Sequence, residues 1–335
     1  MKLVMPFCYH PTTIILVDDD AAFVNIMAAK LSDDFLCQAY HNVRDALLMS
    51  QNYVAQPFTS RCLDEDVDPQ ERDAFAAINS IHGEIYNAKR FNNISVMVVD
   101  YQMPAMNGLE FCQAVRQQHP EIKLIMLTGE AEEMLAIKAF NDKIIDQFIR
   151  KSHTDLFKII KSTINVMQYE YFHHLSSSIC SALMCGATSL SHCLQDIDFA
   201  DFFQDFLQQH RISEYYLLQN KANFLLLDVD GNVNWLIIRD DEDMQAEIDV
   251  ADDQYENSPT AQTQVIVENM RNHKQLPFFY SAEDYCKDIN AWQPYMHPIK
   301  HVALAGKNYY YVFISGASIY SITQEKIASF RACQE

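Results

Sequence analysis

The sequence predicts an α/β first half, built as a doubly wound parallel sheet of five strands, and a second half of the α+β class. Three observations predict this. Short apolar runs alternate with helical patterns over the first half of the chain. Several of these runs end directly in polar side chains, as the strands of ligand-binding open sheets do. In the second half, an Asp-Gly turn separates two apolar runs, which is typical of an antiparallel hairpin.

The first predicted strand, Thr13–Val17, ends in three consecutive acids, Asp18, Asp19 and Asp20. A helical face follows up to Leu31 (Phe23, Ile26, Met27, Leu31). The segment from Phe35 to Tyr40 is the second predicted strand, and Arg44 to Met49 begins another helix.

Three later strands end in the same way. Val96 to Val99 is a continuous apolar run that ends in Asp100, followed by a Pro-x-x-x-Gly loop and an amphipathic helix. The run Lys123–Leu127 ends in Thr128 and Gly129, and Asp146–Arg150 ends in Lys151. Because the carboxyl ends of parallel strands meet at one edge of a sheet, these side chains are expected to lie together.

At these strand ends the sequence resembles the receiver domain of two-component response regulators, over residues of about 12–170. The resemblance implies a flavodoxin-like order of the five parallel strands. The resemblance implies that Asp100 is a phosphoacceptor and that Asp18 and Asp19 form an acidic pocket, with Asp19 the more direct metal ligand. It also implies a sensor histidine kinase or phosphotransfer protein as the phosphodonor. Three further roles follow from it: switch hydroxyl, charge partner and switch aromatic (Thr128, Lys151, Phe148). Serine follows Lys151 where that family usually has proline.

The chemistry of phosphoryl transfer accounts for the same residue types. Clustered carboxylates repel a phosphoryl group unless a divalent cation is present, and Mg2+ prefers a shell of oxygen ligands. Asp19, Asp100 and the backbone carbonyl of Gln102 can supply three oxygens, with Asp18 acting through water. Lys151 adds the positive charge that phosphoryl transfer requires. Thr128 can donate a hydrogen bond to a phosphoryl oxygen, and Gly129 leaves room beside it for the incoming group.

The predicted receiver domain, residues 1–153, carries a long insertion. Asp19 and Asp100 lie 81 positions apart, nearly twice what a minimal receiver needs, and the surplus falls in about residues 50–92. An amphipathic helix is expected from about Pro69 to Lys89. The insertion either extends the second helix and its loop or recognises a partner. Together with an output of unfamiliar type, it resembles the quorum-sensing response regulators of the Legionella type.

A long helical pattern from Thr154 to about Met184 contains no proline or glycine. It predicts a helical connector over residues 154–185 that serves as a dimer seam. The alternative is a helix broken at Ser176–Ser178 and folded onto the second domain, since serine is only a weak helix breaker.

Residues 186–335 are predicted to form the output domain, with strands and helices mixed. Asp228–Asn232 reads as a hairpin turn with Gly231 at its tip. The same run resembles the first motif of haloacid-dehalogenase-type phosphatases, but no acidic pair follows a later strand. Helices are expected at Asp198–Gln209, 241–253, 260–273, 281–289 and Thr323–Cys333, and strands at Tyr215–Leu218, Phe224–Leu227, Val233–Ile238 and Tyr309–Ile314.

Composition excludes several functions. A net charge of −20 disfavours direct DNA binding, which needs clustered Lys and Arg. No apolar run approaches the length of a membrane span. Seven glycines form no Gly-rich phosphate loop. Nine cysteines without close paired spacing predict reduced thiols and a cytoplasmic location.

The sequence therefore predicts a cytoplasmic, homodimeric response regulator that takes phosphate on Asp100 with Mg2+ and is not an enzyme. Its output domain would signal through changed dimer or partner contacts. Two alternatives stay open: a scaffold that works without phosphorylation, and a regulated enzyme with a catalytic or nucleotide-binding site in the C-terminal domain.

Overall fold

The computed structural model describes residues 4–55, 83–129, 131–183, 192–219, 222–279, 284, 287–316 and 322–334. Packing divides the chain into two compact units, which we name after their sheets. The parallel-sheet unit contains the described residues of Tyr9–Asp66, Asn87–Ala182 and Ser329–Glu335. The antiparallel-sheet unit contains those of Met1–Cys8, Val67–Tyr86 and Leu183–Ala328.

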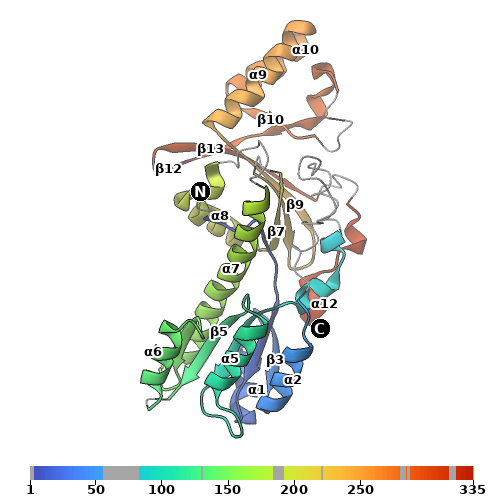
Figure 1. Cartoon of the computed structure of the whole chain (residues 1–335). Helices are drawn as coiled ribbons and strands as arrows, with labels where there is room; N and C mark the ends of the chain where they lie inside the picture. Colours follow the sequence, from blue (N-terminus) through green and yellow to red (C-terminus); the bar gives the residue numbers. More distant parts are fainter. Residues whose placement is uncertain are drawn as a thin grey trace. The chain divides into compact units, whose positions relative to one another are not determined.

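Five parallel strands form the centre of the first unit (Figure 1). In spatial order they are β3 (Leu36–Tyr40), β2 (Thr13–Val17), β4 (Ile94–Asp100), β5 (Lys123–Thr128) and β6 (Gln147–Arg150). Every residue of β4 is buried, as its continuous apolar run predicts for a strand covered on both faces. The flavodoxin-like order is therefore confirmed, with β4 in the middle and its final residue, Asp100, between the ends of β2 and β5.

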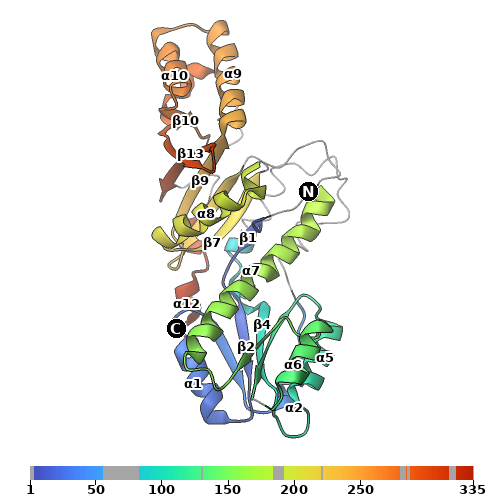
Figure 2. The same cartoon turned by 90° about the vertical axis from the view of Figure 1, so that its left-hand side faces the viewer.

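Helices cover both faces of this sheet (Figure 2). Side chains alternate along β2, so Ile15 and Val17 face one layer of helices while Ile14 and Leu16 face the other. The first layer is α2 (Val43–Asn52), α5 (Gly108–Gln118) and α6 (Glu133–Asn141). The second layer is α1 (Ala21–Leu31) and α7 (Leu156–Leu183).

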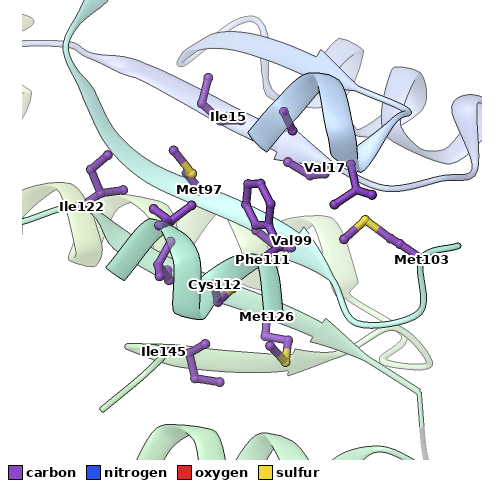
Figure 3. Packing of buried hydrophobic residues seen from close by; sticks show 14 of the residues in the cluster. Ile15, Val17, Met97, Val99, Met103, Phe111, Cys112, Ile122, Met126 and Ile145 are labelled. Carbon is purple, nitrogen blue, oxygen red and sulfur yellow. The ribbon is translucent and has the colours of Figure 1, made fainter. Parts of the chain in front are cut away.

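The first layer packs on the sheet through a cluster centred on α5. Phe111 of α5 is fully buried and lies in the middle of this cluster, with Met97, Val99 and Met126 from the sheet around it (Figure 3). Aromatic side chains of this size contribute much of the apolar area that a core removes from water.

Helix α7 runs without a break for 28 residues. Its apolar face (Leu156, Ile160, Ile164, Met167) is part of the core of the parallel-sheet unit. The helix continues through Ser177, whose hydroxyl donates to the carbonyl of His173, 2.8 Å away. Of the two alternatives, the structure therefore has the continuous helix, and its described residues up to Ala182 belong to this unit.

Packing also divides the chain at other points than the predicted boundaries of 153 and 185. The last residues return to the parallel-sheet unit, where the Phe330 ring lies 5.8 Å from that of Phe91. The first residues join the antiparallel sheet, since Leu217 donates its backbone N–H to the carbonyl of Phe7.

The second unit is built on a six-stranded sheet (Figure 1). Its order is β1 (Cys8–Tyr9), β7 (Ile212–Gln219), β8 (Asn223–Asp228), β9 (Val233–Asp240), β13 (Lys307–Ser315) and β12 (Lys300–Leu304). Helix α8 (Ile197–Gln209) packs on it through Phe199 and Phe203, whose rings contact Tyr309 and Tyr215. This unit also contains α9 (Asp241–Asn257), α10 (Ala261–Arg271), the paired strands β10 (Gln275–Pro277) and β11 (Met296–Pro298), and short 3-10 helices η2 (His192–Gln195), η3 (Ile289–Ala291) and η4 (Gln293–Tyr295). Another short 3-10 helix, η1 (Ala88–Asn92), precedes β4 in the parallel-sheet unit.

The turn between β8 and β9 is the predicted hairpin. Gly231 has φ of 78°, a conformation that favours glycine, and its N–H donates to the carbonyl of Asp228. Both carboxylate oxygens of Asp228 accept hydrogen bonds within the turn, from the backbone of Asp230 and from Asn232. Asp228 thus stabilises its own turn, which favours the hairpin over the phosphatase motif.

One prediction for the second half differs from the structure. The single helix expected over Thr323–Cys333 is wrong: a 3-10 helix, η5 (Gln324–Lys326), and a short helix, α12 (Phe330–Gln334), are separated by extended backbone. The helix stops because the N–H of Ala328 donates to the carbonyl of Ile85 instead of continuing an i to i−4 ladder. Most of the helices expected at 281–289 and from about Pro69 to Lys89 lies outside the described residues.

Within the part of the chain that the structure describes, no helix combines the length and apolar character that a membrane crossing requires.

The position of Phe111 predicts a large loss of stability on truncation. Phe111→Ala should lower the free energy of unfolding of the parallel-sheet unit by about 3–5 kcal/mol, because it removes buried contacts and leaves a cavity. Calorimetry of the full chain measures this. Phe140→Ala is the matched control: that side chain is 44% exposed, and less than about 1 kcal/mol is expected. Equal losses for both variants would contradict the assignment of Phe111 to the core.

Candidate functional site

The strand ends bring the predicted side chains to one edge of the parallel sheet. Asp18 follows β2, Asp100 ends β4, Thr128 ends β5 and Lys151 follows β6, and these four strands are neighbours in this order. Backbone bonds extend the pairing beyond the strands: Tyr101 N–H donates to Leu127, and Lys151 N–H donates to Thr128, both over 2.9 Å. The edge is therefore held by the sheet itself.

Lys151 joins two carboxylates at this edge. Its Nζ lies 2.7 Å from Asp18 Oδ2 and 2.8 Å from Asp100 Oδ1. Both acids are nearly inaccessible, with 1% and 4% of their surface exposed. The ammonium also lies 4.9 Å from the centre of the Phe23 ring. This cation–π contact has no signal in the sequence.

Burial shifts the titration of this pair. Loss of water contact raises the pKa of Asp100 to about 6, although the hydrogen bond and charge of Lys151 act in the opposite direction, and the neighbouring Asp18 carboxylate adds to the rise. For Lys151, burial alone would lower the pKa of the ammonium. Its hydrogen bonds to Asp100 and Asp18 outweigh burial, and the pKa is raised.

The three acids after β2 have different partners. Asp18 accepts a hydrogen bond from the N–H of Asp20, which in turn caps α1 by accepting from Ala22 and Phe23. Oxygens of Asp18, Asp19 and Asp100 all lie within 4.8 Å of one another. Asp20 is thus used by the helix, whereas Asp18 and Asp19 form one cluster of carboxylates with Asp100.

This donor set fits a hard divalent cation. Carboxylate oxygens are the ligands that Mg2+ prefers, and it binds through one or two of them while keeping several waters. Asp19 is exposed to solvent, which leaves room for such waters. The contribution of the Gln102 carbonyl stays a prediction.

The hydroxyl of Thr128 makes no hydrogen bond within the described structure. Its side chain is fully buried, and Oγ has no hydrogen-bond partner among the described residues. A buried hydroxyl without a partner costs free energy, so this group is prepared to donate to a ligand.

The loop after Asp100 explains the Pro-x-x-x-Gly pattern. A Cβ on Gly108 would lie 2.1 Å from the backbone oxygen of Asp100, so only glycine allows this approach. Asn107 and Glu110 form a capping box that begins α5 at the same point. The loop is therefore folded tightly against the backbone of the site.

One further contact of the site, between the side chains of Glu132 and Gln102, has no signal in the sequence. Glu132 precedes α6, is 6% exposed, and accepts a hydrogen bond of 2.5 Å from the side chain of Gln102. Neither belongs to a motif, and only the folding of two loops brings them together. Phe148, the predicted switch aromatic, is half-buried on β6, with its ring 6.5 Å from that of Phe140.

Comparison with known proteins adds to this geometry. The family model of the response regulator receiver domain matches residues 75–161, which include Asp100, Thr128 and Lys151. No curated protein sequence matches the chain. The solved structure of the response regulator LqsR from Legionella pneumophila is similar over 99% of this chain and 95% of that chain, with 31% identity and a TM-score of 0.79.

The chain belongs to the response regulators. Two other solved structures are similar to about half of it. A receiver domain protein from Clostridium thermocellum covers 48% of the chain at 18% identity, and a Francisella response regulator receiver domain covers 48% at 14% identity, each with a TM-score of 0.33. These two carry no part of the family assignment.

The raised pKa of Asp100 predicts how this response regulator's stability depends on pH. The folded protein holds the Asp100 proton more tightly than the unfolded chain does, so ionising this group costs stability as pH rises from about 4 to about 6. Asp100→Asn should therefore be more stable than the wild type, on the order of 1–3 kcal/mol at pH 7.5 and least at pH 4. Thermal melting in a chelator at several pH values measures this.

Asn141→Ser serves as a control, because it is an exposed change that does not titrate, and its difference from the wild type should stay constant with pH. A stability gain of Asp100→Asn that grows on acidification would contradict the assignment of the shift to Asp100.

Proposed function

We propose that this response regulator is phosphorylated on Asp100 with the help of Mg2+, by a sensor histidine kinase or a phosphotransfer protein. The observation that supports this most is the position of Lys151, within 2.8 Å of both Asp18 and Asp100 at the strand edge. One buried carboxylate, Asp100, is thus held next to the Lys151 ammonium, the carboxylates of Asp18 and Asp19, and the Thr128 hydroxyl, which has no partner among the described residues.

In the proposed reaction an Asp100 carboxylate oxygen attacks phosphorus of the phosphodonor. A new O–P bond forms while the bond from phosphorus to the donor's leaving atom breaks, and the leaving group departs with the bonding electrons. Lys151 offsets the charge on the transferred group, and the Thr128 hydroxyl donates to one of its oxygens.

Asp18, Asp19, Asp100 and the Gln102 carbonyl would hold Mg2+. When bound, the cation neutralises the charge of the acids and of the phosphoryl oxygens. Asp19 is the exposed member of this set. On its side of the site, the cation would exchange its water ligands with solvent.

The signal would leave the site through Thr128 and Phe148. A Thr128 hydroxyl drawn to the phosphoryl group moves the start of the β5–α6 segment, and the half-buried Phe148 ring repacks beside Phe140. Exposed apolar side chains of α6, Met134 and Leu135, would then offer changed contacts to a second copy or a partner. The net charge of −20 supports an output that does not bind DNA directly.

The other predicted functions find less support. A scaffold independent of phosphorylation would have no need for two buried acids at one edge, beside a buried hydroxyl that no described residue pairs with. An enzymatic C-terminal domain through Asp228 conflicts with the use of that carboxylate in its own turn. A role in quorum sensing stays a prediction from the resemblance.

Incubation with acetyl phosphate and Mg2+ tests the proposal. The full chain should gain the mass of one phosphoryl group, measured by intact mass spectrometry, and lose it when Mg2+ is chelated beforehand. Asp100→Asn should gain nothing, since the amide is not a nucleophile for phosphorus. Asp142→Asn, an exposed acid on the same unit, should react as the wild type does. A phosphorylated Asp100→Asn would show that another residue is the acceptor.

A further inference from the structure

The space beside Gly129 is already filled. The sequence predicts that this glycine leaves room for an incoming phosphoryl group, but a Cβ placed on it would lie only 2.6 Å from Glu132 Oε2. Gly129 follows Thr128 directly, and β5 pairs with β4 up to Asp100 itself. A phosphoryl group on Asp100 that accepts a bond from Thr128 would therefore approach the place that the Glu132 carboxylate occupies.

Among the described residues, one hydrogen bond holds the Glu132 side chain there. Gln102, two residues after Asp100, donates its side-chain amide to Oε1 over 2.5 Å. The other oxygen, Oε2, is buried and has no hydrogen-bond partner in the part of the chain that the structure describes. The side chain as a whole is 6% exposed. The carboxylate thus connects the loop after β4 to the loop after β5 and presents an unpaired oxygen next to Gly129.

Such an oxygen is costly where it is. A buried carboxylate is stable only when its oxygens are paired, and no cation of the described residues contacts this one. Lys151 is committed to Asp18 and Asp100, and Arg150 pairs with the neighbouring Glu133. Glu132 is therefore a fourth acid of this edge, set apart from the three that could bind a metal, and it carries the same sign of charge as a phosphoryl group.

We propose that Glu132 is the gate of the phosphoryl site: its carboxylate, tethered by Gln102, places a negative charge where the phosphoryl oxygens need to lie, and this charge opposes transfer until the side chain leaves. This inference rests on the proposed function, because it concerns access to Asp100. Glu132 is a positioning residue in this scheme. It does not react; it limits how often the site is open, and repulsion between two negative charges keeps it away once Asp100 is phosphorylated.

The gate predicts that a loss of charge speeds the reaction. Glu132→Gln keeps the shape of the side chain and the possibility of bonding Gln102, but removes the repulsion. At saturating Mg2+, its initial rate of phosphorylation by acetyl phosphate should exceed that of the wild type by roughly tenfold. A residue with only a structural role would give the opposite result, since its loss would disturb the loop and slow the reaction. Intact mass spectrometry over time gives the rate, and thermal melting verifies that each variant is folded.

The matched control is Glu133→Gln. This neighbouring acid ion-pairs with Arg150, and its neutralisation should leave the rate within about twofold of the wild type. A second variant, Gln102→Ala, keeps the backbone carbonyl and removes the tether, so it should also speed the reaction. The double variant of Gln102→Ala with Glu132→Gln should be no faster than Glu132→Gln alone, because both changes act on one gate.

The outcomes separate the two proposals. A wild-type chain that takes no phosphoryl group contradicts the proposed function. A wild type that is phosphorylated, together with a folded Glu132→Gln that reacts at the same rate or more slowly, overturns the gate and leaves the proposed function intact.

Discussion

Two carboxylates that lie side by side away from water repel each other, and Lys151 offsets this repulsion for Asp18 and Asp100. Its ammonium is within hydrogen-bond distance of both. Removing Lys151 would leave two buried carboxylates without a compensating charge, which costs far more than a surface ion pair gains. The edge of the sheet is therefore organised around one cation, and the pKa of Asp100 stays raised even in its presence. That residual cost is what a second, divalent cation would relieve.

The polar side chains around this cation differ in whether they have hydrogen-bond partners within the protein. Asp20 is fully used by the first turn of α1, while Asp19 is exposed and Thr128 has a hydroxyl with no partner in the described structure. Groups needed by the fold are paired within it, and groups that would serve a ligand are left open. Gly108 also serves the fold, because the absence of a Cβ lets the loop pack against the backbone of Asp100.

Much of this arrangement could be predicted because parallel strands place their carboxyl ends together. The apolar runs before Asp18, Asp100, Thr128 and Lys151 mark the strands, and the polar residue after each run marks the edge. What the sequence could not provide are contacts between loops. Glu132 and Gln102 lie 30 positions apart with no repeating pattern between them, so their hydrogen bond becomes evident only in three dimensions.

The second unit shows the limits of periodicity more broadly. Long strands such as β8 and β9 have runs that can be recognised, whereas β10 and β11 have three residues each and exist only as a pair. The helix expected over Thr323–Cys333 fails for a similar reason, since its backbone bonds to the distant Ile85. Local preference was overruled there by a tertiary contact.

The insertion lies between β2 and β4, the two strands that carry the acids of the pocket. The entropy cost of bringing β2 and β4 together rises only with the logarithm of the length of chain between them. Doubling that length therefore lowers the free energy of unfolding by about 0.6 kcal/mol. Folding speed responds more strongly, because pairing between residues far apart in the chain is slow. The central strand pair of the sheet is thus expected to form late, and the pocket exists only after this remote pairing is complete.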